Sequence, residues 1–263
     1  MANQQQKSYK ILLVGDSCYD IYHYGEVKRI SPEAPIPIFD LKYSIKKYGM
    51  ASNVCENLKA LGAEVHIHTN FLETKNRYID IKSKQQLLRV DEKNEKGGFG
   101  GIMYDLIHYK KYDAIVISDY NKGFFQRSDY TKLKQNFEGP IFIDTKDTYL
   151  NYYEGAIVKI NQHEYEKATV SAGILDNLIV TYGGDKVNWY TKNPGNPKVF
   201  FPPNVEAHDV CGAGDTFLAA LAIRYIETQS IEESIEFAMK SAAITVKHIG
   251  VYAPTREEIE NGN

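Results

Sequence analysis

Short apolar segments recur along the chain and are separated by stretches with helical periodicity. The segments that read as buried strands span residues 10–16, 113–119, 140–145, 156–161 and 177–181. Near-continuous runs of aliphatic and β-branched residues, alternating with helices, are typical of parallel strands covered on both faces. We therefore predict an α/β fold with a central, mostly parallel sheet.

Helical periodicity is clear in three of the intervening stretches. Met50, Val54, Leu58 and Leu61 lie on one face of the first, and Gly62 provides a C-terminal stop. The other two helices are predicted over residues 213–226 and 231–246.

Two segments, about 20–48 and 75–91, differ from the rest of the chain. They alternate with period two in places, and no helical pattern separates their short strands. Pro32, Pro35 and Pro37 restrict the first segment to extended or edge conformations. We predict a small antiparallel layer that covers the crevice of the main sheet as a lid.

Polar residues end four of the predicted strands, at Asp16, Asp119, Asp144 and Asn161. In open α/β sheets ligands bind beyond the carboxyl ends of the strands, so these side chains are expected to face one crevice. The alternative is that each strand simply runs into a polar turn.

Composition excludes several classes of partner. The 31 basic and 34 acidic residues nearly balance and form no long like-charged run, so no nucleic-acid partner is expected. No segment approaches the ~18 apolar residues of a membrane span, and the first ten residues do not resemble a leader. We expect a cytoplasmic protein without membrane contact, in which Cys18, Cys55 and Cys211 are reduced thiols.

The stretch "DVCGAGD" stands directly before the apolar run of the second predicted helix. The first N–H groups of a helix lack partners and attract anions, and glycine lets the backbone approach a ligand closely. An acid there, Asp215, would repel a resting anion unless it takes a proton from a hydroxyl that attacks the same phosphorus. The motif thus favours phosphoryl transfer, although a purely structural glycine-rich helix start remains open. It lacks the lysine and hydroxyl residue of a Walker loop.

With this motif, the sequence resembles the ribokinase-like (PfkB) carbohydrate kinases, and most closely their D-glycero-β-D-manno-heptose 7-phosphate kinases. The similarity continues through "GDSCYDIYHYG", "RISPEAPIPIF", "QQLLRVD", "SDYNKG", "IDTK", "NQHE" and "VTYGG", in the family's order and over essentially the whole chain. The resemblance implies a single ribokinase-like three-layer domain over residues 1–263. It also implies ATP and Mg²⁺ as cofactors and a small-molecule sugar phosphate as substrate.

The resemblance also assigns residue roles. Asp215 corresponds to the catalytic base, and Gly212, Ala213 and Gly214 to the anion hole. The implied substrate-binding residues are Asp20, Gly49 and Asn53, with Arg29, Lys75, Arg77 and Arg89 as candidates for a distal phosphate. From the residues alone, Asp20 could be a turn aspartate and Asn53 a helix cap, while lone lid arginines are commonly solvated or paired.

On the nucleotide side, the resemblance implies that Asn161 and Glu164 hold magnesium and phosphate oxygens through water, although their spacing equally fits a capping box. Further cofactor-binding candidates are Lys122, Lys146, Thr181 and Gly183. For Lys122 and Lys146 the alternative is a surface lysine beside a turn.

The sequence departs from the family at several points. Met50 stands where a second glycine is usual, Cys211 replaces a common threonine, and the segments after Gly62 and Glu166 are short. A nucleotidyltransferase module after Asn263 is not expected. These differences keep open a kinase for another sugar, sugar phosphate or nucleoside, or a non-catalytic sugar-phosphate binder. Exposed lid edges favour a homodimer formed through the lid.

Overall fold

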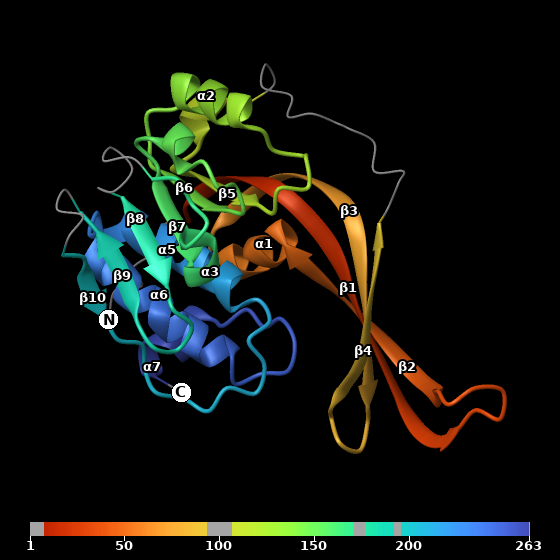
Figure 1. The fold of residues 1–263 in the computed structure, drawn as a ribbon. Helices are drawn as coiled ribbons and strands as arrows, with labels where there is room; N and C mark the ends of the chain where they lie inside the picture. Colours follow the sequence, from red (N-terminus) through yellow and green to blue (C-terminus); the bar gives the residue numbers. More distant parts are fainter. Residues whose placement is uncertain (1–7, 94–106, 171–176, 192–195, 263) are drawn as a thin grey trace.

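The computed structural model describes residues 8–93, 107–170, 177–191 and 196–262. Within these ranges one ten-stranded sheet runs in the order β10-β9-β8-β7-β6-β5-β1-β3-β4, with β2 paired to β1 (Figure 1). The strands are β1 (Lys10–Ile30), β2 (Pro37–Met50), β3 (Glu64–Asp80), β4 (Gln86–Lys93), β5 (Ala114–Asp119), β6 (Ile141–Thr145), β7 (Ile157–Asn161), β8 (Leu178–Thr181), β9 (Val187–Tyr190) and β10 (Lys198–Phe200).

The centre of the sheet is parallel, as predicted. Neighbours from β3 through β1, β5, β6 and β7 to β8 all run in the same direction, while β2, β4, β9 and β10 are antiparallel to their partners. In β1, Ile11, Leu12, Leu13 and Val14 are all fully buried, because helices cover both faces. All five predicted strands are confirmed, although β1 is three times longer than expected.

Helices form a layer on each face of the sheet (Figure 1). They are α1 (Ala51–Ala60), α2 (Arg127–Asn136), α3 (Gln162–Tyr165), α5 (Ala213–Thr228), α6 (Ile231–Thr245) and α7 (Arg256–Asn261), with 3₁₀ turns η2 (Tyr109–Lys111) and η3 (Leu150–Tyr153). Alternate residues of β1 belong to two separate cores: Leu13 lies in the cluster of α1, α5 and α6, and Leu12 in that of α2 and η3. The expected three-layer α/β arrangement is confirmed. Among the described residues, no helix combines the length and apolar character that crossing a bilayer requires.

The lid strands extend the core sheet directly. β1 and β3 stay parallel from Lys10↔Glu64 to Gly25↔Asp80, and Figure 1 shows this pair leaving the layered core with β2 and β4 on its outer edges. The prediction of a separate antiparallel layer is therefore wrong for its central pair. The physical reason is that no proline or helical pattern follows Asp16: "SCYDIYHYG" is rich in aromatic residues, which suit a strand. The three cysteines are free, as expected.

Candidate active site

The first turn of α5 presents backbone amides beside a carboxylate. Gly212 precedes the helix with φ of 80°, a left-handed conformation that glycine adopts readily. The Ala213 amide donates to the Val210 carbonyl over 3.3 Å. Among the described residues, the Gly214 and Asp215 amides donate to no protein acceptor, as is usual for the first turn of a helix. Two of the amides around the glycines thus remain available for an anion.

Asp215 lies in this first turn with only 4% of its surface exposed. Its Oδ2 accepts from the Asn53 side-chain amide over 2.9 Å, and its Oδ1 accepts from the Tyr120 hydroxyl over 2.9 Å. Burial raises the pKa of Asp215 to about 6, because the two donors and the Lys159 ammonium offset only part of the desolvation. A carboxylate that titrates near neutrality suits a general base.

Asn53 lies inside α1. The residue before that helix is Met50, and no side chain caps its N-terminus, so the helix-cap interpretation of Asn53 is wrong. Asn57, one turn later in the same helix, donates to the Asn53 carbonyl over 2.8 Å. Asn53 is buried and is oriented toward Asp215.

Met50 forms the junction between β2 and α1 with φ of 60° and ψ of −132°. Residues with a Cβ rarely adopt this conformation, which explains why glycine is usual at this position in the family that the sequence resembles. The Met50 side chain is nevertheless buried. The backbone of this chain therefore keeps the glycine-like bend with a larger residue.

Asp20 is buried in the middle of β1, so the turn interpretation is wrong for it. Its Oδ1 accepts from Nε of Arg77 on β3 over 3.2 Å, and Nη2 of the same guanidinium lies 3.2 Å from this oxygen in an ion pair. Gly49 of β2 lies against the same carboxylate: a Cβ at Gly49 would lie 2.3 Å from Asp20 Oδ2 and 2.7 Å from Cys18 Sγ. The glycine is thus required by the close packing of Asp20.

Strand register places several basic residues on the face of the lid that carries Asp20. Lys75 is opposite Asp20 in β3, and Arg77 is opposite Arg89 in β4. Each already has an acidic partner, Arg89 with Asp91 at 2.6 Å and Lys75 with Glu73 at 3.4 Å. Lys47 of β2 is also opposite Asp20, and its ammonium donates to the Val251 carbonyl over 3.0 Å.

Arg29 does not join this group within the single chain. It lies exposed near the far end of β1, nine residues beyond Asp20, which corresponds to roughly 30 Å along a strand. Of the sequence-predicted substrate residues, the structure brings together Asp20, Gly49 and Asn53 but leaves Arg29 apart.

Two of the strand-end carboxylates support a loop. Asp16 accepts from the amides of Tyr120, Lys122 and Phe124 over 2.9, 3.1 and 3.4 Å. Asp119 accepts from the Thr145 hydroxyl over 2.6 Å, and burial raises its pKa to about 6. Both groups therefore order the loop after β5. Backbone amides and a hydroxyl thus occupy oxygens of Asp16 and Asp119, and the orientation of both groups toward the crevice stays a prediction.

The same loop carries Lys122, whose ammonium pairs with Glu73 Oε2 at 3.1 Å. Glu73 belongs to β3, so this ion pair connects the loop after β5 to the base of the lid. Lys122 therefore has a partner in the lid, although its side chain is partly exposed.

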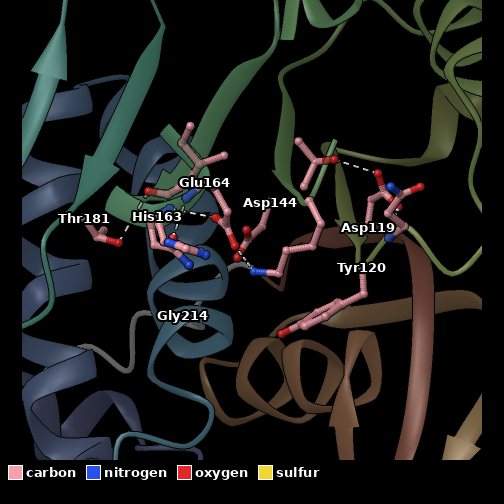
Figure 2. Close-up of polar contacts among 12 residues, drawn as sticks. Asp119, Tyr120, Asp144, His163, Glu164, Thr181 and Gly214 are labelled. Atoms are coloured by element: carbon pink, nitrogen blue, oxygen red, sulfur yellow. Dashed lines mark hydrogen bonds and ion pairs between the residues drawn. The ribbon is translucent and has the colours of Figure 1, made fainter. Parts of the chain in front are cut away.

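Asn161 and Glu164 form a reciprocal capping box at the start of α3. Asn161 Oδ1 accepts from the Glu164 amide over 3.0 Å, and Glu164 Oε2 accepts from the Asn161 amide over 2.8 Å. Glu164 Oε1 pairs with the Lys146 ammonium. A metal ion at Glu164 would therefore have to displace Lys146 or be reached through water. Figure 2 shows Glu164, Asp144 and Tyr120 approaching the same space from the ends of β7, β6 and β5.

Asp144 and Lys159 make a buried ion pair beneath the first turn of α5. The Lys159 ammonium lies 2.7 Å from Asp144 Oδ2 and 3.4 Å from the Gly214 carbonyl oxygen. A Cβ at Gly214 would lie 3.0 Å from Lys159 Nζ, so glycine is favoured there by space as well as by ligand approach. Lys159 and Tyr120 were not predicted as site residues. For Lys159 a signal existed, since it is the one charged residue in the buried run of β7.

A cavity of about 390 Å³ opens beside the start of α5. Thr181 and Gly183, predicted near the nucleotide, lie on its wall, and Gly183 turns the chain with φ of 58°. Ala213, the first residue of α5, also lines the cavity, so the cavity reaches the N-terminus of that helix. The remaining lining is largely apolar and includes Val187, Pro202, Pro203, Val205, Val210, Phe217 and Met239.

Comparison with known proteins agrees with this geometry. Residues 145–258, which include the capping box, the cavity wall and the α5 motif, match the model of the pfkB family carbohydrate kinases. Residues 145–258 are thus similar to this family.

Curated relatives are similar to this chain over almost its whole length. The bifunctional protein HldE of Nitratiruptor sp. is 30% identical over 301 residues, covering 95% of this chain and 64% of the relative. HldE of Helicobacter pylori is 28% identical, with 95% and 65% covered. The chain thus spans slightly less than two thirds of the length of these relatives.

Solved structures share the fold of this chain. The ribokinase of Thermotoga maritima superposes with a TM-score of 0.69 at 18% identity, covering 97% of this chain and 99% of its own. Arabidopsis thaliana ribokinase, solved with ribose and ATP, gives 0.71 at 16% identity with the same coverage. The expected ribokinase-like fold is confirmed.

Proposed function

We propose that this protein is an ATP-dependent sugar kinase in which Asp215 deprotonates the acceptor hydroxyl. The observation that carries the proposal is the position of the Asp215 carboxylate, in the first helical turn beside the Gly214 and Asp215 amides, which have no acceptor in the described part of the chain. An anion-binding helix start with a base alongside is what in-line phosphoryl transfer to an alcohol requires.

In the proposed reaction the sugar hydroxyl gives its proton to Asp215 while its oxygen forms a bond to the γ-phosphorus of ATP. The bond from that phosphorus to the β–γ bridging oxygen breaks, and ADP leaves with the electron pair. The amides at the start of α5 stabilise the charge on the transferred group. Asn53 holds the carboxylate in place through its bond to Oδ2.

The residues present fit a nucleotide. The cavity of about 390 Å³ offers largely apolar walls for a base, and it meets the helix N-terminus at Ala213. Lys146 would pair with phosphate oxygens once it exchanges Glu164 for the ligand. Thr181 and Gly183 stay predictions for this side of the site.

Magnesium is proposed to arrive with ATP. Among the described residues no cluster of three or more His, Cys, Asp or Glu side chains could hold a metal ion. Mg²⁺ commonly keeps several waters and binds through substrate phosphates. Asn161 and Glu164 would then contact it through water, which leaves their capping box intact.

For the substrate we propose D-glycero-β-D-manno-heptose 7-phosphate, phosphorylated at the anomeric hydroxyl to the 1,7-bisphosphate. The motif resemblance supports this choice, and Arg77 and Arg89 on the Asp20 face of the lid could meet a second phosphate. The shortened segments and Met50 keep a kinase for another sugar, sugar phosphate or nucleoside as the alternative.

The test is ATP consumption with a panel of sugars, sugar phosphates and nucleosides, comparing the parent with Asp215→Asn. We expect turnover with the heptose phosphate in the parent and a loss of roughly 10²-fold or more in the variant. Turnover that survives Asp215→Asn would remove Asp215 from the mechanism. Binding of sugar phosphate without any turnover in the parent would favour a non-catalytic binder.

We further propose a homodimer formed through the lid. Exposed apolar side chains concentrate there, among them Leu41, Tyr43 and Ile45 of β2 and Leu87 and Leu88 of β4. Such an apolar, exposed strand surface is typical of an interface. Light scattering would contradict the dimer by giving the mass of one chain, 29.9 kDa.

We propose that the protein acts in the cytoplasm, because a kinase of this kind uses cellular ATP.

A further inference from the structure

Tyr120 connects the loop after β5 to the base of the proposed reaction. Its hydroxyl lies 2.9 Å from Asp215 Oδ1, and its backbone amide donates to Asp16 over 2.9 Å. The ammonium groups of Lys75 and Lys146 lie 5.8 and 5.2 Å from the centre of its ring. Tyr120 thus contacts the core through Asp16, the lid through Lys75 and the predicted nucleotide side through Lys146.

We propose that Tyr120 is a positioning residue for Asp215, an inference that rests on the proposed kinase function. Its hydroxyl and the Asn53 amide hold one carboxylate oxygen each, so the plane of the carboxylate is fixed between α1 and β5. A carboxylate accepts about four hydrogen bonds, two at each oxygen. One site at each oxygen therefore stays open for the acceptor hydroxyl.

The direction of this hydrogen bond follows from chemistry. An ionised carboxylate only accepts, so the Tyr120 hydroxyl is the donor. Burial, together with the nearby Asp215 and Asp144 carboxylates, raises the pKa of Tyr120 well above its ordinary value. The phenol consequently keeps its proton throughout the pH range of a kinase assay.

Other groups around Asp215 set its charge together with Tyr120. The neutral Asn53 amide comes from α1, the Lys159 ammonium from β7 and the Asp144 carboxylate from β6. Lys146, which follows β6, also interacts with Asp215 electrostatically. Removing only the Tyr120 hydroxyl leaves all of these in place, and it withdraws one of the two donors that favour the ionised base.

The first test is the pH dependence of kcat for Tyr120→Phe against the parent. We expect the acidic limb to move to higher pH by about one unit, with most of the activity recovered at alkaline pH. Tyr149→Phe is the matched control, because that tyrosine is exposed on the turn after β6. The acidic limb of this variant should lie at the same pH as that of the parent. An unmoved limb in Tyr120→Phe overturns the inference.

A second readout does not need activity. A protein with a buried acid whose native pKa is raised becomes less stable as pH rises. Because Tyr120→Phe should raise the native pKa of Asp215 further, we expect its Tm to fall more steeply than that of the parent between pH 4.5 and 7.5. The same substitution in an Asp215→Asn background should leave that pH dependence unchanged. An equal fall in parent and Tyr120→Phe overturns the inference, whereas binding of sugar phosphate without turnover in the parent would overturn the proposed function instead.

Discussion

The Asn53 side-chain amide donates to Asp215 Oδ2 over 2.9 Å and joins the first turn of α1 to the first turn of α5. A Cβ at Gly212 would lie 2.7 Å from the same Asn53 nitrogen, so the glycine before α5 keeps room for this bond. Since α1 follows directly from lid strand β2, the bond also places the proposed base next to the sheet that carries Asp20.

We expect kcat/KM to fall with decreasing pH through an acidic limb near pH 6. The reason is that burial raises the pKa of Asp215 to about 6, and the protonated acid cannot accept the proton of the sugar hydroxyl. Rates measured between pH 4.5 and 8.5 check this. A profile that stays flat down to pH 4.5 would exclude Asp215 as the titrating base.

Asp215→Asn should be more stable than the parent at pH 7.5. The parent Asp215 has a native pKa near 6 against an unfolded value of 3.8, so the native state binds more protons between these values and stability falls as pH rises through that window. The difference amounts to up to about 3 kcal/mol.

Urea unfolding at pH 7.5 and pH 4 measures this effect. The advantage of Asp215→Asn should shrink at pH 4, where Asp215 is protonated in the native state and partly protonated in the unfolded state. An advantage of equal size at both pH values would mean that the charge of Asp215 is not its cause.

Much of the fold could be predicted from the sequence because it depends on local patterns. The run Ile11–Val14 is apolar at every position, which indicates a strand buried on both faces, and the structure confirms it. The course of β3 was not predicted. Its first half, from Glu64, alternates histidines with aliphatic residues, which is the period-two pattern of a half-buried strand, while its long parallel pairing with β1 is seen only in the structure.

The candidate site was predictable where one short motif carries it. Asp215 and Gly214 are neighbours in sequence, so their shared helical turn follows from spacing alone. Tyr120 and Asn53 reach Asp215 across sequence separations of 95 and 162 residues, and no spacing reports such contacts. The role of Asn53 was predicted only through the family resemblance. For Tyr120 the sequence offers no signal besides its position directly after a predicted strand.

Gly49→Ala should destabilise the protein and weaken sugar binding. The new methyl group would lie 2.3 Å from Asp20 Oδ2, so the Asp20–Arg77 pair must move, at a cost of about 1–3 kcal/mol. Gly184→Ala is the control, because nothing lies within 4 Å of a Cβ there. Denaturant midpoints compare the two, and equal midpoints would contradict the packing argument.

Lys159→Met should destabilise the chain by about 3–5 kcal/mol, because it leaves the buried Asp144 carboxylate without its partner. The double variant with Asp144→Asn removes that uncompensated charge and should recover much of the loss. A double-mutant cycle in urea measures the coupling. Additive effects of the two substitutions would show that the ion pair contributes nothing.

Met50→Gly should be more stable than Met50→Ala, the reverse of the usual order. Both variants lose the same buried side chain beyond Cβ, so their difference isolates the backbone. At φ of 60° and ψ of −132° an alanine keeps the strain that glycine avoids, which favours glycine by about 1–3 kcal/mol.

The matched pair for this comparison lies at Met239, a buried methionine inside α6. There alanine should exceed glycine by about 0.5–1 kcal/mol, because glycine weakens a helix interior. Urea unfolding of all four variants gives the two differences. If alanine were the more stable residue at both positions, the junction between β2 and α1 would not need the glycine-like bend, and Met50 would be an ordinary core residue.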